Sequence, residues 1–211
     1  MRPYYERDGI VIYHGDCREL LPTLGDADLV LTDPPYGLAE RWNGGGGTSH
    51  SSWRFNPNEA KNWDANTVSD VSYWLSRSPS IVWGGNYYAL PPSRAWLIWD
   101  KKQNDQFTTG QAELAWTNLD IPIRIFRMSQ VEAYCNPADP KLHPTQKPIA
   151  LIKWCLSFVP DAQTILDPFM GSGTTLRAAK DLGRKAIGIE IEERYCEIAA
   201  KRLSQEVLAL A

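Results

Sequence analysis

The sequence predicts an α/β fold, with a mostly parallel sheet and helices on both faces. Short apolar runs alternate with amphipathic helical patterns along the chain, as the βαβ units of parallel sheets require. A chain of 211 residues with 43% hydrophobic and 22% charged residues has the size and composition of an ordinary globular domain. No internal repeat or clear linker divides it, so we expect a single domain over residues 1–211.

Short apolar runs bounded by polar or turn-forming residues are expected to form the strands. In chain order they are Ile10–Tyr13, Asp28–Thr32, Ser80–Trp83, Ala95–Trp99, Glu113–Trp116, Ile121–Arg127, Thr164–Leu166 and Ala186–Ile189. Segments with helical periodicity are Thr67–Ser76, Lys147–Phe158, Thr174–Asp181 and Glu192–Leu208. Gly183 is a suitable stop for the third of these helices.

Two long stretches fit neither pattern. Gly37–Ala65 contains four consecutive glycines at Gly44–Gly47, and Met128–His143 contains two prolines. Loops of this length inside a compact domain are usually functional or disordered. We therefore treat both stretches as candidate contact loops.

Composition excludes several classes of protein. No apolar run approaches the ~20 residues that span a bilayer, so no membrane segment is expected. The charged, aromatic amino terminus has no apolar core of a secretion signal, and an intracellular, reducing location is expected. The cysteines are widely spaced without a CxxC pair, which argues against a zinc site and against a disulfide scaffold. They are Cys17, Cys135, Cys155 and Cys196.

The charge balance is mildly acidic, with a net charge of −3 and a pI near 5.7. The chain therefore lacks the overall basic character of many nucleic-acid-binding proteins. This balance still permits DNA binding, because a small basic cleft can form within an acidic body.

The segment DPFMGSGTT (167–175) follows an expected strand and opens an expected helix. Its glycines allow the backbone to approach a ligand closely, and the helix N-terminus offers free N–H groups. No Lys follows Gly173, which argues against an NTPase, and Leu176 stands where the dinucleotide fingerprint has Gly or Ala. Glu190 ends the next expected strand, 19 residues after Gly171, where a carboxylate can bind ribose hydroxyls. Together these features predict a cofactor that contains adenosine.

The segment Asp33-Pro34-Pro35-Tyr36 follows the apolar run DLVLT (28–32). Two prolines after a strand impose a rigid extended turn, which holds Asp33 and Tyr36 in fixed places. This pairing suits methylation of an exocyclic amino group on a nucleobase. Its protons would donate to Asp33 and to the Pro34 carbonyl, which frees the nitrogen lone pair for attack, while Tyr36 would stack on a flipped base. Such catalysis needs positioning and electrostatics, without a metal or a covalent intermediate.

These boxes resemble those of the DNA amino-methyltransferases that use S-adenosylmethionine. The chain contains DPPY (33–36), DPFMGSGTT (167–175), GIE (188–190) and HPTQKP (143–148), and the catalytic box precedes the glycine loop. That order resembles the permuted β-type of the family, whose fold is the Rossmann-like class I methyltransferase sheet. Lesser stretches are similar to small phage-type DNA methylases: Gly15-Asp16, WGGNYY (83–88) and ELAWT (113–117).

The resemblance implies a role for each matched residue. Asp33, Pro34, Pro35 and Tyr36 would form the catalytic box, with Asp33 also bordering the cofactor. The other matched residues would bind S-adenosylmethionine. Its methionine end would be held by Asp167, Phe169, Gly171, Ser172 and Gly173, and its methionine carboxylate by His143, Thr145 and Lys147. Glu190 would bind its ribose, and Asp16 its adenine.

The target base expected from the resemblance is adenine, at N6. The cysteines follow Asp16, Tyr134, Trp154 and Tyr195, whereas cytosine-C5 enzymes place their nucleophile after proline. Asp in the first box position is more typical of adenine-N6 enzymes, and Ser of cytosine-N4 enzymes. Cytosine N4 is the alternative, followed by RNA or a protein glutamine amide. An NAD-binding Rossmann oxidoreductase and a non-catalytic DNA-binding relic are weaker alternatives, because the DPPY box would be idle in both.

Sequence recognition is the least defined property. Asn118–Leu142 is 25 residues long, too short for a separate recognition domain, so base contacts are expected from the loops 37–65 and 128–142. The charged residues of 37–65 sum to zero, so this loop is no basic patch. We expect a short or relaxed target sequence, or recognition shared within a homodimer. The candidate DNA contacts are Arg41, Trp42, Trp53, Arg54, Lys61 and Trp63.

The expected substrate partner is double-stranded DNA, in the cytoplasm of a bacterial or phage-infected cell. A chain of this length has no room for a fused nuclease domain. A restriction endonuclease partner would therefore be a separate protein, and its existence is left open.

Overall fold

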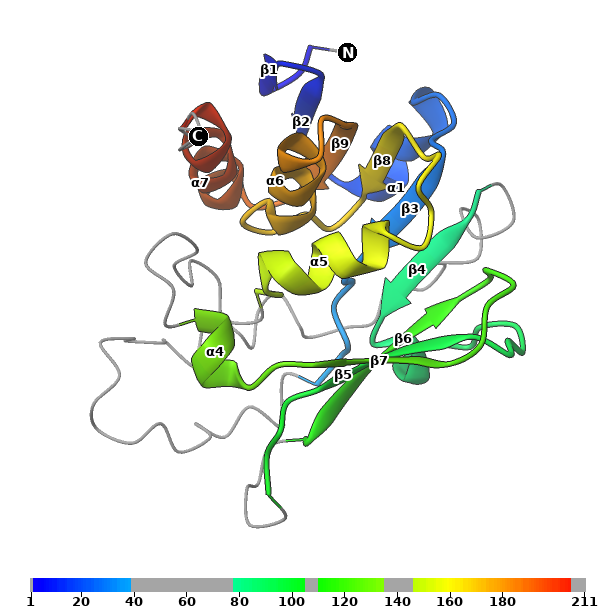
Figure 1. Cartoon of the computed structure of the whole chain (residues 1–211). Coiled ribbons are helices and arrows are strands. Elements are labelled where there is room, and N and C mark those ends of the chain that lie inside the picture. The colour runs from blue at the N-terminus through cyan, green and yellow to red at the C-terminus, as the bar shows by residue number, and fades with distance from the viewer. Residues whose placement is uncertain (1, 39–77, 105–109, 135–145, 206–211) are drawn as a thin grey trace.

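The computed structural model describes residues 2–38, 78–104, 110–134 and 146–205 (Figure 1). Its centre is one sheet in the order β1-β2-β9-β8-β3-β4-β6-β5-β7. The strands are β1 (Tyr5–Arg7), β2 (Ile10–His14), β3 (Leu29–Thr32), β4 (Ser80–Trp83), β5 (Trp96–Asp100), β6 (Ala112–Thr117), β7 (Arg124–Arg127), β8 (Thr164–Asp167) and β9 (Lys185–Glu190).

The sheet is mostly parallel, as predicted. The five neighbouring strands β2, β9, β8, β3 and β4 run parallel to one another, and β1 adds an antiparallel edge. Strand β6 runs antiparallel between β4 and β5, and β7 pairs parallel with β5. Because of its direction, β6 begins at the edge where the parallel strands end.

Helices cover both faces of the sheet. They are α1 (Cys17–Leu20), α4 (Gln130–Tyr134), α5 (Ile149–Leu156), α6 (Thr174–Asp181) and α7 (Glu193–Ser204), with 3₁₀ turns at Leu21–Thr23 and Gly85–Tyr87. One apolar core joins α5, α6 and α7 to alternate strand residues such as Leu29 and Leu31, and a second joins α1 to Val30. This alternation follows from the two-residue period of a strand.

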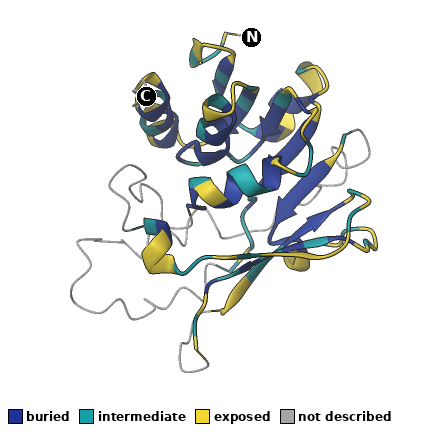
Figure 2. Ribbon diagram, viewed as in Figure 1, coloured by how far each residue is buried: buried dark blue, intermediate teal, exposed yellow. Residues whose placement is uncertain are grey.

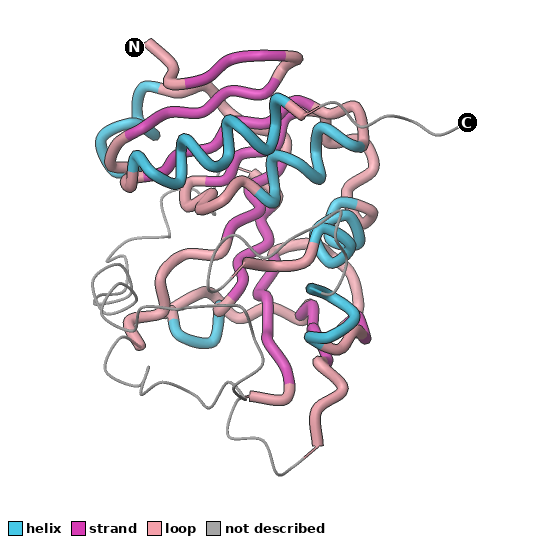
Figure 3. Tube along the Cα trace, turned by 90° about the vertical axis from the view of Figure 1, so that its left-hand side faces the viewer, coloured by secondary structure: helices cyan, strands magenta, loops and turns pink. Residues whose placement is uncertain are grey.

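The central strands are buried, while each covering helix exposes its outer side (Figure 2). In the view turned by 90°, helices lie against the strands of the upper half of the molecule (Figure 3). Among the described residues, no helix combines the length and the apolar character that crossing a lipid bilayer requires.

Every predicted strand exists; β4 has the predicted bounds, and the others are shifted at one or both ends. The largest shift is in β7, which begins at Arg124 instead of Ile121. Pro122 has no N–H to donate to a ladder, and the Ile121 N–H bonds to the Leu119 carbonyl in a turn. The sequence patterns missed β1, α1 and α4, all of which are shorter than six residues.

The helix predictions hold where they can be compared. Helix α6 has the predicted bounds, whereas α5 starts at Ile149 instead of Lys147, because Pro148 is its extended N-cap and the residue before a proline disfavours helical geometry. Helix α7 ends at Ser204, before the predicted Leu208. The predicted helix Thr67–Ser76 lies outside the described residues.

Candidate active site

The site residues gather where β3 and β8 lie side by side. The next strand in the chain after β8 is β9, which lies beside β8, and the next strand after β3 is β4, which lies on the opposite side, beside β3. Such a reversal of strand order opens a crevice at the carboxyl ends, which is where α/β sheets bind ligands. Asp167 ends β8, Asp33 follows β3, and the Thr32 hydroxyl donates to Asp167 Oδ1 at 2.8 Å. The structure therefore brings the predicted catalytic and cofactor boxes together.

The glycine loop connects β8 to α6, and two of its residues adopt backbone angles that favour glycine. Gly171 and Gly173 have φ values of 51° and 79°, in the left-handed region. A Cβ on Gly173 would lie 2.9 Å from the Ala199 Cβ, so this glycine is also required by the packing of α7. The Arg202 guanidinium of α7 is buried and donates to the Ser172 carbonyl at 3.3 Å and to the Thr174 hydroxyl at 3.1 Å. These contacts hold the loop in shape.

Glu190 lies directly against this loop, as the spacing predicted. Its Oε2 accepts from the Gly171 N–H at 3.0 Å, and its Oε1 accepts from the Glu192 N–H at 2.9 Å. Burial raises its pKa to about 7, although both hydrogen bonds oppose the shift. Each carboxylate oxygen has a second acceptor position, so hydroxyl groups can still bind here.

Asp167 has a structural place in the same loop. Its Oδ1 also accepts from the Phe169 N–H at 3.2 Å, which fixes the first turn of the loop. Burial raises the pKa of Asp167 to about 6, against hydrogen bonds from Thr175 and Thr32. The carboxylate thus organises the backbone that the cofactor would touch.

The catalytic box is held by the segment after β4. The Tyr36 hydroxyl donates to Asp33 Oδ1 at 2.5 Å, and the Tyr36 ring stacks on Tyr87 with centroids 4.9 Å apart. The Tyr88 hydroxyl donates to the Pro35 carbonyl. Gly84 has a φ of 68°, and a Cβ there would lie 2.0 Å from the Tyr36 ring, so only glycine fits.

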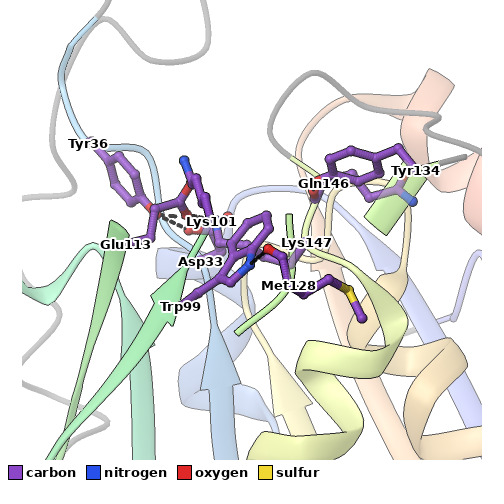
Figure 4. Close-up of polar contacts among 9 residues, drawn as sticks. All are labelled: Asp33, Tyr36, Trp99, Lys101, Glu113, Met128, Tyr134, Gln146 and Lys147. Carbon is purple, nitrogen blue, oxygen red and sulfur yellow. Dashed lines mark hydrogen bonds and ion pairs between the residues drawn. The ribbon is translucent and has the colours of Figure 1, made fainter. Parts of the chain in front are cut away.

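Lys147 reaches the catalytic box from the residues before α5 (Figure 4). Its Nζ lies 2.5 Å from Asp33 Oδ2, 3.0 Å from Glu113 Oε2 and 3.3 Å from the Tyr36 hydroxyl. We expected this ammonium at the methionine carboxylate of the cofactor. That role stays a prediction, and the structure gives the ammonium two protein carboxylates as partners.

Sequence reasoning missed three residues of the site: Lys101, Glu113 and Gln146. Lys101 Nζ lies 2.6 Å from Glu113 Oε1, which extends the charge cluster around Lys147. The Gln146 side-chain oxygen accepts from Ser172 Oγ at 3.2 Å, and its carbonyl accepts from the Tyr134 hydroxyl of α4. Gln146 thereby ties the glycine loop to the segment that carries Lys147. The available signal for the two charged residues was their place at strand ends: Lys101 directly follows β5, and Glu113 is the second residue of β6.

Asp16 follows the end of β2, which lies beside the end of β9 at Glu190, and its carboxylate is bound by Arg18. It is the N-cap of α1, and its Oδ1 accepts from the Arg18 N–H at 2.9 Å and from Arg18 Nε at 3.0 Å. The Arg18 hydrogen bonds hold the pKa of Asp16 below its usual range. The neighbouring Gly15 N–H donates to the Glu190 carbonyl at 2.9 Å, so the proposed contact with adenine stays open.

Several predicted site residues lie outside the described parts of the chain. They are His143 and Thr145 of the HPTQKP segment, and Arg41, Trp42, Trp53, Arg54, Lys61 and Trp63 of the loop 37–65. Of the second loop, residues 128–134 are described, and they contain α4 where no helix was expected. That part of the expectation is wrong, because Ser129 and Glu132 cap each other's backbone N–H groups and start a helix.

Comparisons with known proteins agree on one family. The N6/N4 methyltransferase family model, described as DNA methylase, matches residues 92–201. The type II methyltransferase M.ScaI of Streptomyces caespitosus is 26% identical over 99% of this chain and 86% of its own length. M.HinfI of Haemophilus influenzae is 29% identical over 92% of this chain and 68% of its own.

Solved structures show the same fold. The M1.HpyAVI–SAM complex covers 93% of this chain and 100% of its own, with a TM-score of 0.56 and 21% identity. The match to the cytosine-N4-specific PvuII DNA methyltransferase covers 99% of this chain and 91% of that protein's chain, with a TM-score of 0.58 and 19% identity. The predicted class I methyltransferase fold is confirmed. Because the family match spans more than half of the 211 residues, the chain belongs to the N6/N4 DNA methylase family.

Proposed function

We propose that this DNA methyltransferase transfers the methyl group of S-adenosylmethionine to N6 of adenine in double-stranded DNA. The observation that carries the proposal is the position of Asp33. Its carboxylate follows β3 at the crevice that also holds the glycine loop and Glu190. The family includes both N6 and N4 enzymes, and aspartate in the first box position favours adenine.

The residues of the loop fit S-adenosylmethionine. Glu190 is a carboxylate with spare acceptor positions beside the Gly171 backbone, which suits ribose hydroxyls. Asp167, Phe169, Ser172 and Gly173 line the turn into α6, whose first N–H groups favour a carboxylate. When bound, S-adenosylmethionine supplies a methyl group activated by its sulfonium.

The catalytic box performs the remaining chemistry. Asp33 and the Pro34 carbonyl accept hydrogen bonds from the two protons of the target amino group, which draws its nitrogen toward tetrahedral geometry. The lone pair is then free to attack. Asp33 is placed to receive the proton that leaves the methylated nitrogen, and burial raises the pKa of Asp33 while Lys147 opposes this shift. Tyr36 holds the target base against the box.

DNA contacts belong to the same proposal. A single catalytic domain spans 1–211, and the loops 37–65 and 128–142 contact the duplex around the flipped base. Recognition by loops alone favours a short target sequence or a homodimer that shares recognition between its subunits. The names of the relatives as type II methyltransferases suggest a separate restriction endonuclease as a functional partner.

Mass spectrometry of nucleosides tests the reaction. Unmethylated duplex DNA is incubated with the protein and with S-adenosylmethionine carrying a deuterated methyl group, and the digested DNA is examined for the heavy label. Heavy N6-methyldeoxyadenosine supports the proposal, and an Asp33→Ala protein is the negative control. Heavy N4-methyldeoxycytidine would keep the mechanism and overturn the choice of base. Label on RNA alone would overturn the choice of nucleic acid.

A further inference from the structure

Four charged side chains form an unbroken alternating row at the catalytic box (Figure 4). Lys101 pairs with Glu113 at 2.6 Å, Glu113 pairs with Lys147 at 3.0 Å, and Lys147 pairs with Asp33 at 2.5 Å. The lysine side chains are 9% and 6% exposed, and the carboxylates 26% and 22%. Removing this many charges from water is costly, and apolar side chains would stabilise a core as well. Stability alone therefore does not explain why this row of charges lies beside Asp33, at the carboxyl ends of the parallel strands.

The strand order explains how the row reaches Asp33. Strand β5 ends at the same edge as β3 and β4, and β6 begins there because it runs the opposite way. Glu113 pairs with Trp99 across the two strands, and the Lys101 N–H donates to the Gln111 carbonyl at 2.9 Å. Lys101 Nζ also lies 5.3 Å from the Trp99 ring centroid. Glu113 and Lys101 are thus fixed by the sheet itself.

The ammonium of Lys147 is shared by two carboxylates, those of Asp33 and Glu113. The ammonium donates to Asp33 Oδ2 and to the Tyr36 hydroxyl, and it lies within ion-pair distance of Glu113 Oε2. Without the charge of Glu113, the whole ammonium would be drawn to Asp33. Asp33 would then be a weaker acceptor for the amino protons of a target base.

We propose that Glu113 is a positioning residue, which shares Lys147 with Asp33 and so keeps Asp33 free to accept hydrogen bonds from the target amino group. Lys101 anchors Glu113 in this role. The inference rests on the proposed function and adds two residues to it that act through Lys147 and Asp33.

The charge states agree with this arrangement. Burial by itself would raise the pKa of Glu113, but Lys147 and Lys101 overcome it and lower the pKa to about 2. Burial would lower the pKa of Lys147, but Asp33 and Glu113 raise it. Both groups therefore stay charged at neutral pH. Asp33 is faced by Lys147, which lowers its pKa, by Glu113, which raises it, by Tyr36 as a hydrogen-bond donor, and by Asp167 across the crevice.

The test is the pH profile of kcat for three variants. Glu113→Gln removes a negative charge near Asp33, so the acidic limb of the profile moves to lower pH. Lys147→Met removes a cation, and the limb moves to higher pH. Lys101→Met moves it the same way by a smaller amount, because Lys101 is one step farther along the row. A residue that served folding alone would not produce these opposite signs.

The rate provides a second readout. Glu113→Gln is expected to lower kcat by roughly 10-fold to 100-fold, the scale of a misplaced reacting group, with the affinity for S-adenosylmethionine unchanged. Glu197→Gln is the matched control, because Glu197 pairs with Lys201 at 2.6 Å on the exposed side of α7 and belongs to neither the proposed catalytic box nor the proposed DNA-contacting loops, and its kcat should equal that of the unmodified protein.

Each result decides the question. An unchanged kcat or an unchanged acidic limb in Glu113→Gln overturns the inference, and so does a limb that moves to higher pH. If Glu113→Gln fails to fold, the shift in Lys101→Met decides, and its absence overturns the inference. Failure of the unmodified protein to methylate DNA refutes the proposed function instead, which separates the two.

Discussion

The candidate active site has two halves, the proposed cofactor half and the proposed catalytic half, which are built by different means. The cofactor half uses backbone groups from nearby sequence: the Gly171 N–H meets Glu190, only 19 residues later. The catalytic half uses charged side chains from distant segments, such as Lys147 and Asp33, which are 114 residues apart. Loop shape is thus encoded by local glycines, whereas the environment of Asp33 depends on strand order. Substitutions in the first half should affect binding or folding, and those in the second half should affect turnover.

Replacing Asp33 should have the largest effect. Asp33→Ala removes the acceptor for the target amino group, and we expect methyl transfer to fall by at least about 10³-fold. Binding of S-adenosylmethionine should stay within a few-fold, because Glu190 and the loop are intact. Transfer of a labelled methyl group and calorimetry of cofactor binding measure the two quantities. Loss of both together would mean that Asp33 is structural.

Two substitutions of Tyr36 separate the contribution of its ring to turnover from that of its hydroxyl. Tyr36→Ala removes the surface that holds the base and is expected to lower kcat by about 100-fold, the scale of misplaced reactants. Tyr36→Phe keeps the ring and loses the hydroxyl, which donates to Asp33 and accepts from Lys147. Its kcat should fall by much less. Equal losses in steady-state assays would assign the role of Tyr36 to its hydroxyl.

Glu190 tests the cofactor half. Glu190→Ala leaves ribose hydroxyls unpaired and should weaken affinity for S-adenosylmethionine by roughly 1–3 kcal/mol. The kcat at saturating cofactor should change little, because the catalytic box is untouched. Titration calorimetry measures the affinity, and an unchanged value would refute the assignment of Glu190 to the ribose.

Two glycines test the packing of the loop. Gly173→Ala is strained by its positive φ and by the Cβ contact with Ala199, and it should lower the free energy of unfolding by about 2 kcal/mol. Gly183→Ala is the control, since Gly183 has a φ of +69° but open space around its Cβ, and about 1 kcal/mol is expected. Chemical denaturation compares them. Equal losses would show that the backbone strain alone matters.

Local patterns predicted a large share of this molecule. The glycine loop, the strand end at Glu190 and the bounds of α6 follow from signals within a few residues, because backbone geometry responds to glycine, proline and apolar period. Short elements such as β1 and α4 were missed, since three to five residues carry too little periodicity. The start of α5 was predicted two residues too early, because the prediction followed the apolar pattern and neglected the effect of Pro148 on the residue before it.

The sequence by itself determined the class of fold and predicted the glycine loop and the proposed catalytic box, because each of these signals depends on contiguous residues. Only the tertiary structure decided what surrounds Asp33. Lys101, Glu113 and Lys147 meet because β6 runs antiparallel beside β4 and β5, and that order is set by packing across the whole sheet. Charges that lie far apart in the chain acquire a common function only when the strands that carry them become neighbours.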